Sequence, residues 1–484
     1  MPAYFLENFG CRATQADGAA LERQLAGHGL VRAGEAAAAD VVVLNTCTVT
    51  AAADQDARAA IRRAHRANPA AKILVTGCYA QRAPQEIAAL PGVTWVVGNS
   101  HKHLAAEIAA GAFPSPSCSE ADLTSASSSV FAESVPDSRS HNFVSLEQVS
   151  LSAPAFTLIG DIFAHTELAH TELAHTELIA APAFAHSDDD IGARTRPNLK
   201  VQDGCDNRCS FCIIPSVRGQ SRSMKLERVI AEASALVVAG YREIVLSGIN
   251  LGRWGRDFSP QLRFEQLLRV LLEETDIAKI RISSVEPMDW SDELIALVAG
   301  SPRIAKHAHV PLQSGSDAIL RRMHRKYRPW HYAEKIRKIR EAMPDAAIGA
   351  DVMTGFPGET DELFEENRSF IERLPFTYLH VFTYSSRPGT PSAAMPDQTP
   401  VHIARERNRM LRELATQKNR EFRQSFVGRT LEVITLQTGG DGWTEALSDN
   451  YLKVRMAGRR EANELLPATV SGLGTDDLIA ACET

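Results

Sequence analysis

Two stretches of this 484-residue chain alternate short apolar runs with segments of helical length. Residues 1 to about 113 contain AYFLENFG, VVVLNT and KILVTG, each followed by a helical pattern. Residues from about 198 to 391 contain six further runs: LKVQ, EIVLSG, KIRISSVEP, HAHVPLQ, AIGADVMTGF and YLHVFTYS. Strands that alternate with helices are typical of parallel α/β units. We predict a parallel α/β domain over residues 1–114, and a complete or partial β/α barrel with a trailing basic helix over residues 196–424.

A segment of different character, residues 115–195, separates the two stretches. It is rich in Ser, Ala and Pro and repeats the pentapeptide AHTEL three times. Between Ser119 and Asp190 it carries twelve Asp or Glu residues against one Arg. Such a composition buries too little apolar surface to offset the entropy of ordering the chain. We predict a low-complexity acidic insertion or linker that is disordered, and we assign its repeated histidines no role.

The last segment, residues 425–484, has short alternating apolar runs such as TLEVITL and YLKVRM between glycine turns. This pattern predicts a small all-β barrel of the OB type. The predicted fold class is therefore α/β with an added all-β module.

The composition, 44% hydrophobic and 23% charged, is that of a soluble globular protein. No uncharged apolar run reaches the length of about 18 residues that a membrane span needs. The N-terminal sequence lacks the features of a secretory signal. Eight cysteines are too few for a disulfide scaffold in so long a chain, and clustered thiols in a reducing compartment are commonly metal ligands or catalytic groups. We expect a cytoplasmic protein without a membrane anchor.

The net charge of −7 argues at first against a nucleic-acid partner, because Lys and Arg supply most of the non-specific affinity for phosphate. The acidic segment accounts for this sign, and the rest of the chain is net positive. Basic residues concentrate in two tracts, Arg321–Arg340 and Arg405–Arg423. Two interpretations stay open for both tracts: solvated helix faces, or a phosphate-binding surface.

Three cysteines, Cys205, Cys209 and Cys212, follow the first apolar run of the second stretch in the spacing CxxxCxxC. That position is the carboxyl end of a predicted strand, where α/β folds bind their ligands. A structural zinc site normally has four Cys or His ligands, and no fourth lies nearby. An iron–sulfur cubane held by three thiolates leaves one iron open to a substrate. The motif therefore favours an open 4Fe-4S cluster over zinc or inert thiols.

Three other cysteines, Cys11, Cys47 and Cys78, are far apart in the sequence but share a context. Each lies at or just after the end of a predicted parallel strand, in NFGC, LNTC and VTGC. Because parallel strands end along one edge of a sheet, we expect the three thiols to converge. Two interpretations stay open: a second cubane with an exposed iron, or buried packing residues.

The CxxxCxxC motif resembles that of radical S-adenosylmethionine enzymes, whose open iron binds the cofactor and reduces it to a 5′-deoxyadenosyl radical. Loops after the other strand runs are similar to that family's cofactor contacts. The candidate S-adenosylmethionine-binding residues are Gly248 in LSGIN, Ser284 and Glu286 in SSVEP, Gln313 in PLQSGSD, and Asp351 in GADVMTG. Each is also a common turn former or helix cap.

Taken together, the three modules resemble the radical S-adenosylmethionine methylthiotransferases over the whole chain except the insertion. The resemblance implies a Rossmann-like N-terminal domain, a partial radical-SAM β/α barrel and a C-terminal TRAM-like barrel. GCDNRCSFCIIPSVRGQSRS and VLSGINLGRWG look most similar to the bacterial branch that acts on threonylcarbamoyladenosine. The isopentenyladenosine branch follows, and then the branch that modifies an aspartate of a ribosomal protein.

The resemblance implies a transferase of sulfur-containing groups that methylthiolates C2 of N6-threonylcarbamoyladenosine at position 37 of tRNA. It places one 4Fe-4S cluster on Cys11, Cys47 and Cys78, which presents the sulfur, and a second on the CxxxCxxC motif, with no catalytic residue beyond the ligands. The implied partners are the tRNA anticodon stem-loop, S-adenosylmethionine and an electron donor of the flavodoxin or ferredoxin type, and the implied state is a monomer. The two basic tracts are candidates for holding the RNA backbone. A different class, a non-catalytic metal-cluster protein that binds RNA, is the alternative.

Overall fold

The computed structural model describes residues 1–111, 149–150, 155–164, 195–438 and 442–482. The chain divides into two compact units. The first comprises Met1–Leu178, Gly204–Asp206 and Ile213–Gln220, and the second comprises Ile179–Asp203, Asn207–Cys212 and Ser221–Thr484.

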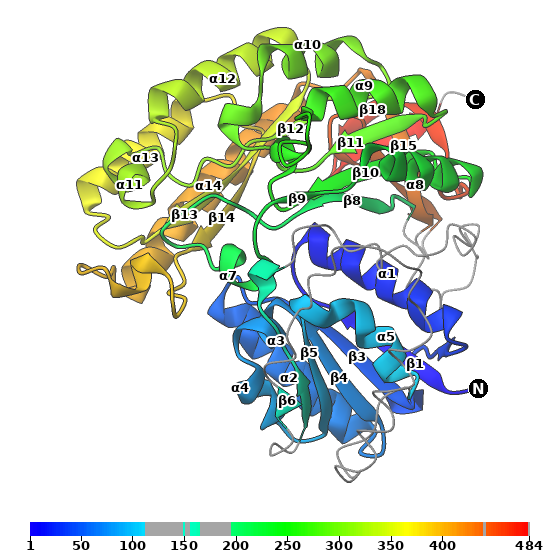
Figure 1. Ribbon diagram of the computed structural model, residues 1–484. Helices are drawn as coiled ribbons and strands as arrows, with labels where there is room; N and C mark the ends of the chain where they lie inside the picture. Colours follow the sequence, from blue (N-terminus) through cyan, green and yellow to red (C-terminus); the bar gives the residue numbers. More distant parts are fainter. Residues whose placement is uncertain (112–148, 151–154, 165–194, 439–441, 483–484) are drawn as a thin grey trace, which may run out of the picture. The chain divides into compact units, whose positions relative to one another are not determined.

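The first unit is a largely parallel sheet with helices on both faces (Figure 1). The strand order is β2-β1-β3-β4-β5-β7-β6, and β6 runs antiparallel to β7. The strands are β1 (Ala3–Asn8), β2 (Val31–Arg32), β3 (Val41–Thr46), β4 (Lys72–Gly77), β5 (Val93–Gly98), β6 (Val149–Ser150) and β7 (Phe156–Leu158). The helices are α1 (Arg12–Gly27), α2 (Ala51–Ala67), α3 (Cys78–Arg82), α4 (Pro84–Ala88), α5 (Ala105–Ala109) and α7 (Ile214–Arg218).

Strand β3 shows why this sheet is covered on both sides. Its apolar residues alternate between two cores: Val41 and Val43 pack with α1 and α5, whereas Val42 and Leu44 pack with α2, α3 and α4. All four are buried. A strand buried on both faces reads as a continuous apolar run, and VVVLNT has this form. The predicted N-terminal α/β fold is confirmed.

Part of the predicted insertion belongs to this sheet. Strand β7 pairs in parallel with β5, and Phe156 and Leu158 are buried against the core on the α1 side. Three residues of apolar-rich sequence thus add a strand, although the surrounding composition is typical of a linker. Within 115–195, only residues 149–150, 155–164 and 195 are described, and the prediction of disorder for the rest lies outside the described residues.

The second unit begins with six parallel strands, the short antiparallel strand β9 and their helices, arranged as an open barrel of two sheets, β11-β10-β8-β9 and β12-β13-β14. Single bridges from Ile280 to Ile304 and from Ser284 to His309 connect them. The strands are β8 (Asn198–Asp203), β9 (Arg222–Ser223), β10 (Glu243–Gly248), β11 (Lys279–Ile282), β12 (His307–His309), β13 (Ala347–Thr354) and β14 (Tyr378–Thr383). The helices are α8 (Leu226–Val238), α9 (Phe264–Glu274), α10 (Asp292–Gly300), α11 (Asp317–Arg322), α12 (Pro329–Ala342), α13 (Asp361–Arg373) and α14 (Val401–Gln424). Of the two predicted forms, a complete or a partial β/α barrel, the structure has the partial one.

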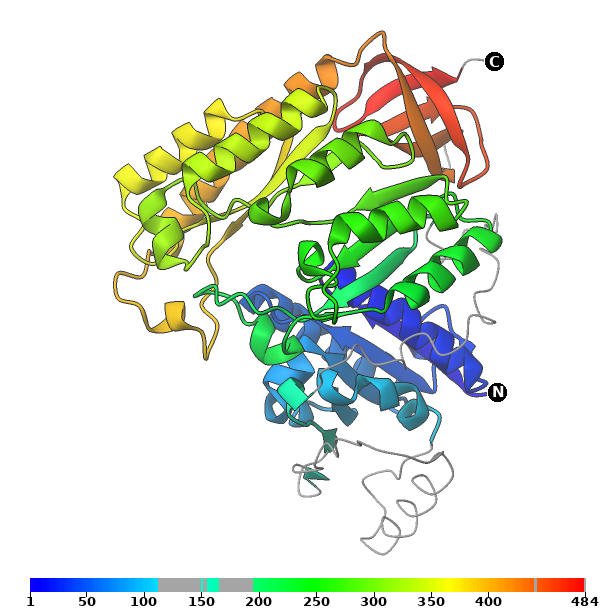
Figure 2. The ribbon, with the colours of Figure 1, turned by 45° about the horizontal axis from the view of Figure 1, so that its top comes forward.

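A closed five-stranded β-barrel completes the second unit (Figure 2). Its strands, in the order β15-β16-β17-β19-β18, are β15 (Thr430–Thr438), β16 (Trp443–Ser448), β17 (Lys453–Ala457), β18 (Leu465–Leu473) and β19 (Leu478–Cys482). Its core includes Phe426, Val433, Val454 and Val470. The predicted C-terminal all-β barrel is confirmed.

The C-terminal barrel packs on the end of the open barrel at which the parallel strands begin. Arg281 near the start of β11 is fully buried, pairs with Glu243 at 2.7 Å, and donates to the carbonyl oxygens of Ser448 and Asp449. The Tyr451 ring stacks on His307, the first residue of β12, with ring centroids 4.4 Å apart. The two barrels of the second unit are therefore joined by buried charged and aromatic contacts, and the opposite end of the open barrel carries the loops that follow the strands.

Candidate functional site

The thiols Cys11, Cys47 and Cys78 follow β1, β3 and β4, which are neighbours in the sheet. In the register of these strands Asn8 pairs with Asn45, and Thr46 pairs with Gly77, so the strands end level with one another. Gly10 allows the first loop to approach the second: a Cβ at this position would lie 2.6 Å from the Cβ of Cys47, and its φ of +98° favours glycine. The structure thus brings the three cysteine-bearing loops to one sheet edge, as predicted.

The electrostatics of this triple require a compensating cation once the thiols ionise. Cys47 and Cys78 are buried and Cys11 is exposed. Burial raises the pKa of the Cys47 thiol to about 12, the neighbouring charge of Cys78 adds to the effect, and Arg218 opposes it. Thiolate ligands are deprotonated when they bind a metal, so an iron–sulfur cluster would supply the missing positive charge. The donor set fits such a cluster.

The three N-terminal sulfurs do not form a group as compact as a single zinc ion needs. Tetrahedral zinc with Zn–S distances of about 2.3 Å holds its sulfurs roughly 3.8 Å apart. In the described ranges, the one group of three potential ligands whose atoms all lie within 4.8 Å of one another is His309, Asp351 and His380. At least two of the three N-terminal sulfurs therefore lie more than 4.8 Å apart, which is farther than the sulfurs around a lone zinc ion.

Polar side chains approach the same thiols. The amide of Asn99 donates to Cys78 Sγ at 3.5 Å and to the carbonyl of Val217 at 2.8 Å, and the hydroxyl of Thr14 lies 3.5 Å from Cys11 Sγ. Such contacts hold metal ligands in position and tune a cluster. Sequence reasoning missed Asn99, because this residue follows β5, a strand after which no cysteine occurs.

The segment that follows the CxxxCxxC motif is part of the first unit. Ile213 and Val217 pack against Cys78, and the Arg218 guanidinium pairs with Asp17 at 2.8 Å. Lys102 pairs with the same carboxylate at 2.9 Å. These three charged side chains are all buried, and a buried carboxylate between two cations is a strong structural restraint. Sequence reasoning missed Asp17 and Arg218, which are about 200 residues apart.

The second triple lies on the loop after β8. The Cys205 amide donates to the carbonyl of Gly219 at 3.0 Å, and the Cys212 amide donates to the carbonyl of Cys209 at 3.1 Å. All three cysteines are partly exposed. Cys205 belongs to the first compact unit and the other two to the second. Their joint binding of a cluster stays a prediction.

Arg325 is the main functional candidate that sequence reasoning misplaced. It lies within the first basic tract, yet it is buried, donates to Cys209 Sγ at 3.1 Å and pairs with Glu286. Burial disfavours its charge, but Tyr327, Glu286 and Cys209 outweigh that effect and raise the pKa of Arg325 well above its ordinary value. This arginine therefore faces a predicted cluster ligand, and its assignment to an RNA-holding surface is wrong.

Four of the five predicted S-adenosylmethionine contacts lie at or after the ends of open-barrel strands, and Asp351 lies inside β13. Gly248 ends β10, and a Cβ on it would lie 3.0 Å from Oε1 of Gln202, so the backbone approaches Gln202 closely. Ser284 and Glu286 follow β11, and burial raises the pKa of Glu286 despite its pairing with Arg325.

Gln313 and Asp351 belong to the same end. Gln313 has a left-handed φ of 66°, and its backbone N–H donates to the backbone carbonyl of Asp351 at 2.8 Å. Gln313 thus follows β12 and contacts Asp351 inside β13, and binding of the cofactor by the five predicted residues stays a prediction.

Asp351 also belongs to a polar cluster that the sequence did not predict. Its carboxylate lies 3.2 Å from His309 Nε2 and 3.3 Å from His380 Nδ1, and the Tyr378 hydroxyl lies 2.9 Å from His309 Nδ1. Burial opposes ionisation of Asp351, but the two histidine hydrogen bonds outweigh it and hold its pKa below the ordinary range. Gly349 makes room for the cluster, because a Cβ there would lie 1.9 Å from Tyr378 Cζ.

The comparisons with known proteins agree with this geometry. Residues 199–371 match the Radical SAM superfamily, and residues 3–98 match the Uncharacterized protein family UPF0004. The chain resembles a solved structure of the radical S-adenosylmethionine methyltransferase TsrM from Kitasatospora setae, with a TM-score of 0.53 over 81% of this chain and 77% of that one, at 15% identity. This likeness concerns the fold alone. None of the helices in the described ranges combines the length and apolar character of a membrane span.

Sequence relatives cover nearly the whole chain. It is 36% identical to threonylcarbamoyladenosine tRNA methylthiotransferase MtaB of Bacillus subtilis (strain 168), over 95% of this chain and 92% of that protein. The identity to the MtaB of Aquifex aeolicus (strain VF5) is 33%, over 95% and 98%. It is 32% identical to tRNA-2-methylthio-N(6)-dimethylallyladenosine synthase of Thermobifida fusca (strain YX), over 97% and 82%. The chain belongs to the radical S-adenosylmethionine methylthiotransferases, the family of the threonylcarbamoyladenosine tRNA methylthiotransferases with which it aligns over nearly its full length.

Proposed function

We propose that this protein methylthiolates C2 of the adenine of N6-threonylcarbamoyladenosine in tRNA, by radical S-adenosylmethionine chemistry. One observation carries the proposal. Cys11, Cys47 and Cys78 are brought to one sheet edge in a chain whose residues 199–371 match the Radical SAM superfamily. A radical enzyme that only methylates has no need of this additional thiol triple. The identity of 33–36% to enzymes named for threonylcarbamoyladenosine supports the substrate.

The side chains have separate tasks in this proposal. Each thiol triple holds a 4Fe-4S cluster with one iron free of protein ligands. Asn99 and Arg325 donate to Cys78 and Cys209, respectively. The residues that cradle S-adenosylmethionine are Gly248, Ser284, Glu286, Gln313 and Asp351.

The cofactors supply what side chains lack, because an adenine C2–H bond offers no practical acid–base handle. When bound, one S-adenosylmethionine would supply the methyl group, a second would supply the 5′-deoxyadenosyl group that accepts the C2 hydrogen, and a reduced donor would supply the electrons. The cluster held by Cys11, Cys47 and Cys78 would supply the sulfur, so that C2–H is replaced by C2–SCH3. The protein's own contribution is to hold the flipped-out base and to keep water away from it.

The proposal extends to partners and setting. The substrate is the anticodon stem-loop, since single-stranded loops offer unstacked bases to a protein. The electron donor is of the flavodoxin or ferredoxin type. The enzyme acts as a monomer in the cytoplasm.

Two matched substitutions test the assignment of the clusters. Anaerobically purified protein is expected to hold about eight iron atoms per chain, four for each cubane. Cys47→Ala should lower iron content and abolish sulfur insertion while S-adenosylmethionine cleavage continues. Cys209→Ala should abolish both activities. Methylthio product from the Cys47→Ala protein, or zinc in place of iron, would contradict the proposal.

A second candidate substrate is isopentenyladenosine, favoured by the 32% identity to a dimethylallyladenosine-specific relative over 97% of the chain. Nucleoside mass spectrometry of tRNA from a deletion strain separates the two. We expect loss of the methylthio-threonylcarbamoyl nucleoside with the methylthio-isopentenyl nucleoside unchanged. The reverse result would transfer the protein to the second branch.

A further inference from the structure

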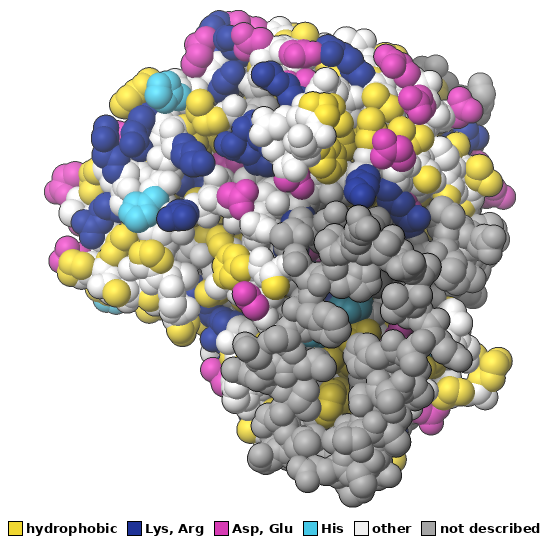
Figure 3. All heavy atoms as spheres, in the orientation of Figure 1, with side chains coloured by type: hydrophobic (Ala, Val, Ile, Leu, Met, Phe, Trp, Pro, Cys, Tyr) yellow, Lys and Arg dark blue, Asp and Glu magenta, His cyan; other side chains and the backbone are white. Residues whose placement is uncertain are grey.

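Three basic residues of α12, which belong to the first basic tract, pair with nearby acids. Lys338 pairs with Asp292 at 2.8 Å, and Lys335 lies 3.8 Å from the same carboxylate. Arg337 pairs with Glu334 at 2.7 Å and with Glu341 at 2.5 Å. Figure 3 shows Lys, Arg, Asp and Glu side chains interspersed over this face. The charges of these three side chains are therefore offset by Asp292, Glu334 and Glu341, and this surface of α12 has little net charge to offer to phosphate.

Helix α14 carries the second tract, and its buried arginines serve the fold. Arg407 pairs with Glu359 at 2.9 Å and with Asp361 at 2.7 Å. Arg423 is also buried and donates to three carbonyl oxygens of the C-terminal barrel, those of Gly474, Thr475 and Asp477. Neither guanidinium is available to a partner.

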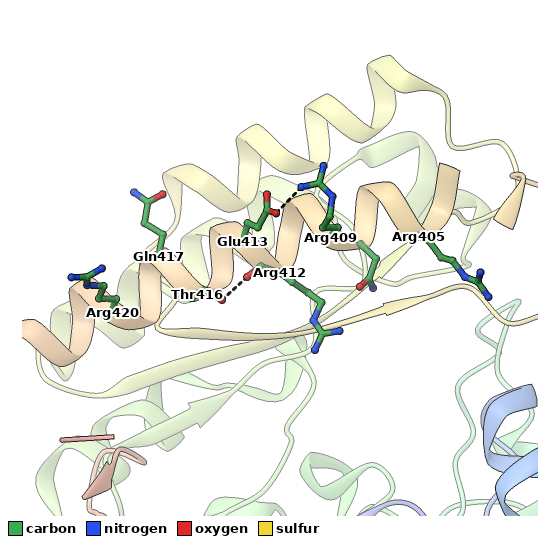
Figure 4. Close-up of a pocket in the computed structure, with 8 residues that line it drawn as sticks. Arg405, Arg409, Arg412, Glu413, Thr416, Gln417 and Arg420 are labelled. Carbon is green, nitrogen blue, oxygen red and sulfur yellow. Dashed lines mark hydrogen bonds and ion pairs between the residues drawn. The ribbon is translucent and has the colours of Figure 1, made fainter. Parts of the chain in front are cut away.

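The exposed arginines of α14 differ from both groups. Arg405, Arg412 and Arg420 extend into solvent from the helix (Figure 4), and within the described part of the chain none of them has a carboxylate partner. Arg409, between them, is paired with Glu413 at 2.6 Å. All five residues line one open hollow over the helix. At about 1.5 Å per residue, the three unpaired guanidinium groups are spread over roughly 22 Å of helix.

The ends of α14 show where this row leads. Near its start, the hydroxyl of Thr354 donates to the carbonyl of Ala404 at 3.1 Å, and Gly355 leaves no room for a Cβ, which would lie 2.3 Å from that of Ala404. Thr354 is the last residue of β13, so Arg405 lies on the side of the barrel where the strands end. At its other end α14 leads into the C-terminal barrel. The row of arginines connects the strand-end loops with that barrel.

We propose that Arg405, Arg412 and Arg420 bind backbone phosphates of the RNA as it leaves the strand-end loops toward the C-terminal barrel, and that α12 does not take part. This inference rests on the proposed function, because it takes tRNA as the partner. Guanidinium groups bind phosphate through paired hydrogen bonds, and a row without competing carboxylates is free to do so. Such contacts position the RNA without reading its sequence.

The test measures the salt dependence of RNA binding. A fluorescent anticodon stem-loop RNA is titrated with the full-length protein at several KCl concentrations, and log K is plotted against log [KCl]. The variant is Arg405→Gln/Arg412→Gln/Arg420→Gln. The control is Lys335→Gln/Arg337→Gln/Lys338→Gln, which removes the same formal charge from α12. Loss of three phosphate contacts should make the slope less negative by about 2, at roughly 0.7 per contact for single-stranded RNA. The control should keep the wild-type slope.

The outcomes separate this inference from the proposed function. Failure of the wild-type protein to bind the RNA refutes tRNA as the partner. Wild-type binding with an unchanged slope in the α14 variant, or equal changes in both variants, overturns the inference alone. Binding to anionic lipid vesicles is measured for the same proteins. If the α14 variant loses vesicle binding while its RNA binding stays intact, the inference is also overturned. Turnover at saturating RNA should persist in the α14 variant while its KM rises, and unchanged iron content confirms that the variant is folded.

Discussion

Replacing Gly349 with Ala should disorder the three-stranded sheet β12-β13-β14. The Tyr378 ring lies directly over Gly349, and an added Cβ would lie 1.9 Å from Cζ and 2.3 Å from both Cε atoms. To regain an ordinary carbon–carbon contact of about 3.5 Å, the ring must move by roughly 1.6 Å. Its hydroxyl lies 2.7 Å from His307 Nε2 and 2.9 Å from His309 Nδ1, so the shift breaks both hydrogen bonds.

The expected loss of stability follows from these two effects. Forcing an extra carbon into a packed site costs about 1–3 kcal/mol. Two lost hydrogen bonds add about 1 kcal/mol each. The sum is about 3–5 kcal/mol, which raises local opening by roughly 100- to 3,000-fold at about 1.4 kcal/mol per tenfold.

Hydrogen exchange of the intact protein, followed by mass spectrometry of peptides from β12 to β14, measures this opening without assuming two-state unfolding. Gly472→Ala is the control, because Gly472 is also in a strand but has open space around it. Tyr378→Leu removes the ring and should suppress the effect of Gly349→Ala. Equal effects of Gly349→Ala with and without the ring would refute the reasoning.

Three further predictions concern buried charge. Arg325→Met should lower the reduction potential of a cluster bound through Cys209. The decrease should be at most about 65–130 mV if the lost hydrogen bond contributes about 1.5–3 kcal/mol. An unchanged potential in a redox titration would contradict this prediction. Asp351→Asn should lower the unfolding free energy at pH 7, because the folded pKa of Asp351 lies below its unfolded value of about 3.9. The difference in unfolding free energy between the wild-type protein and the variant should shrink as the pH falls below that value. A difference that does not change with pH in urea titrations would count against this prediction. Arg281→Met leaves Glu243 buried with one weak partner and should cost about 3–5 kcal/mol, measured as faster hydrogen exchange in β10 and β11.

The cysteine positions could be predicted because they depend on strand order. Parallel strands separated by helices end on one edge, and NFGC, LNTC and VTGC each place a cysteine at or just after such an end. The same rule located Gly248 and Gln313 at or after strand ends of the open barrel, whereas Asp351 lies inside β13. In each case, the hydrophobic pattern alone determined the position.

Burial of individual charges could not be predicted in this way. Arg325 and Arg337 belong to the same basic tract, but the first contacts Cys209 and the second pairs with exposed glutamates. Local composition does not show which side of a segment faces the core. The pairing of His309 with Tyr378 likewise joins two strands about 70 residues apart, although HAH in β12 already placed two histidines on one face of a strand.

The contacts between the two barrels of the second unit bear on the order in which the chain becomes stable during synthesis. The ribosome synthesises the open-barrel side of this contact first, with Glu243, Arg281 and His307. The residues that cover it emerge more than 140 residues later; they are Ser448, Asp449 and Tyr451. Until then Arg281, Glu243 and His307 stay exposed at the end of the open barrel where its strands begin, because the residues that cover them have not yet been synthesised. A nascent or truncated chain that stops before β16 should therefore be a preferred client of chaperones and proteases.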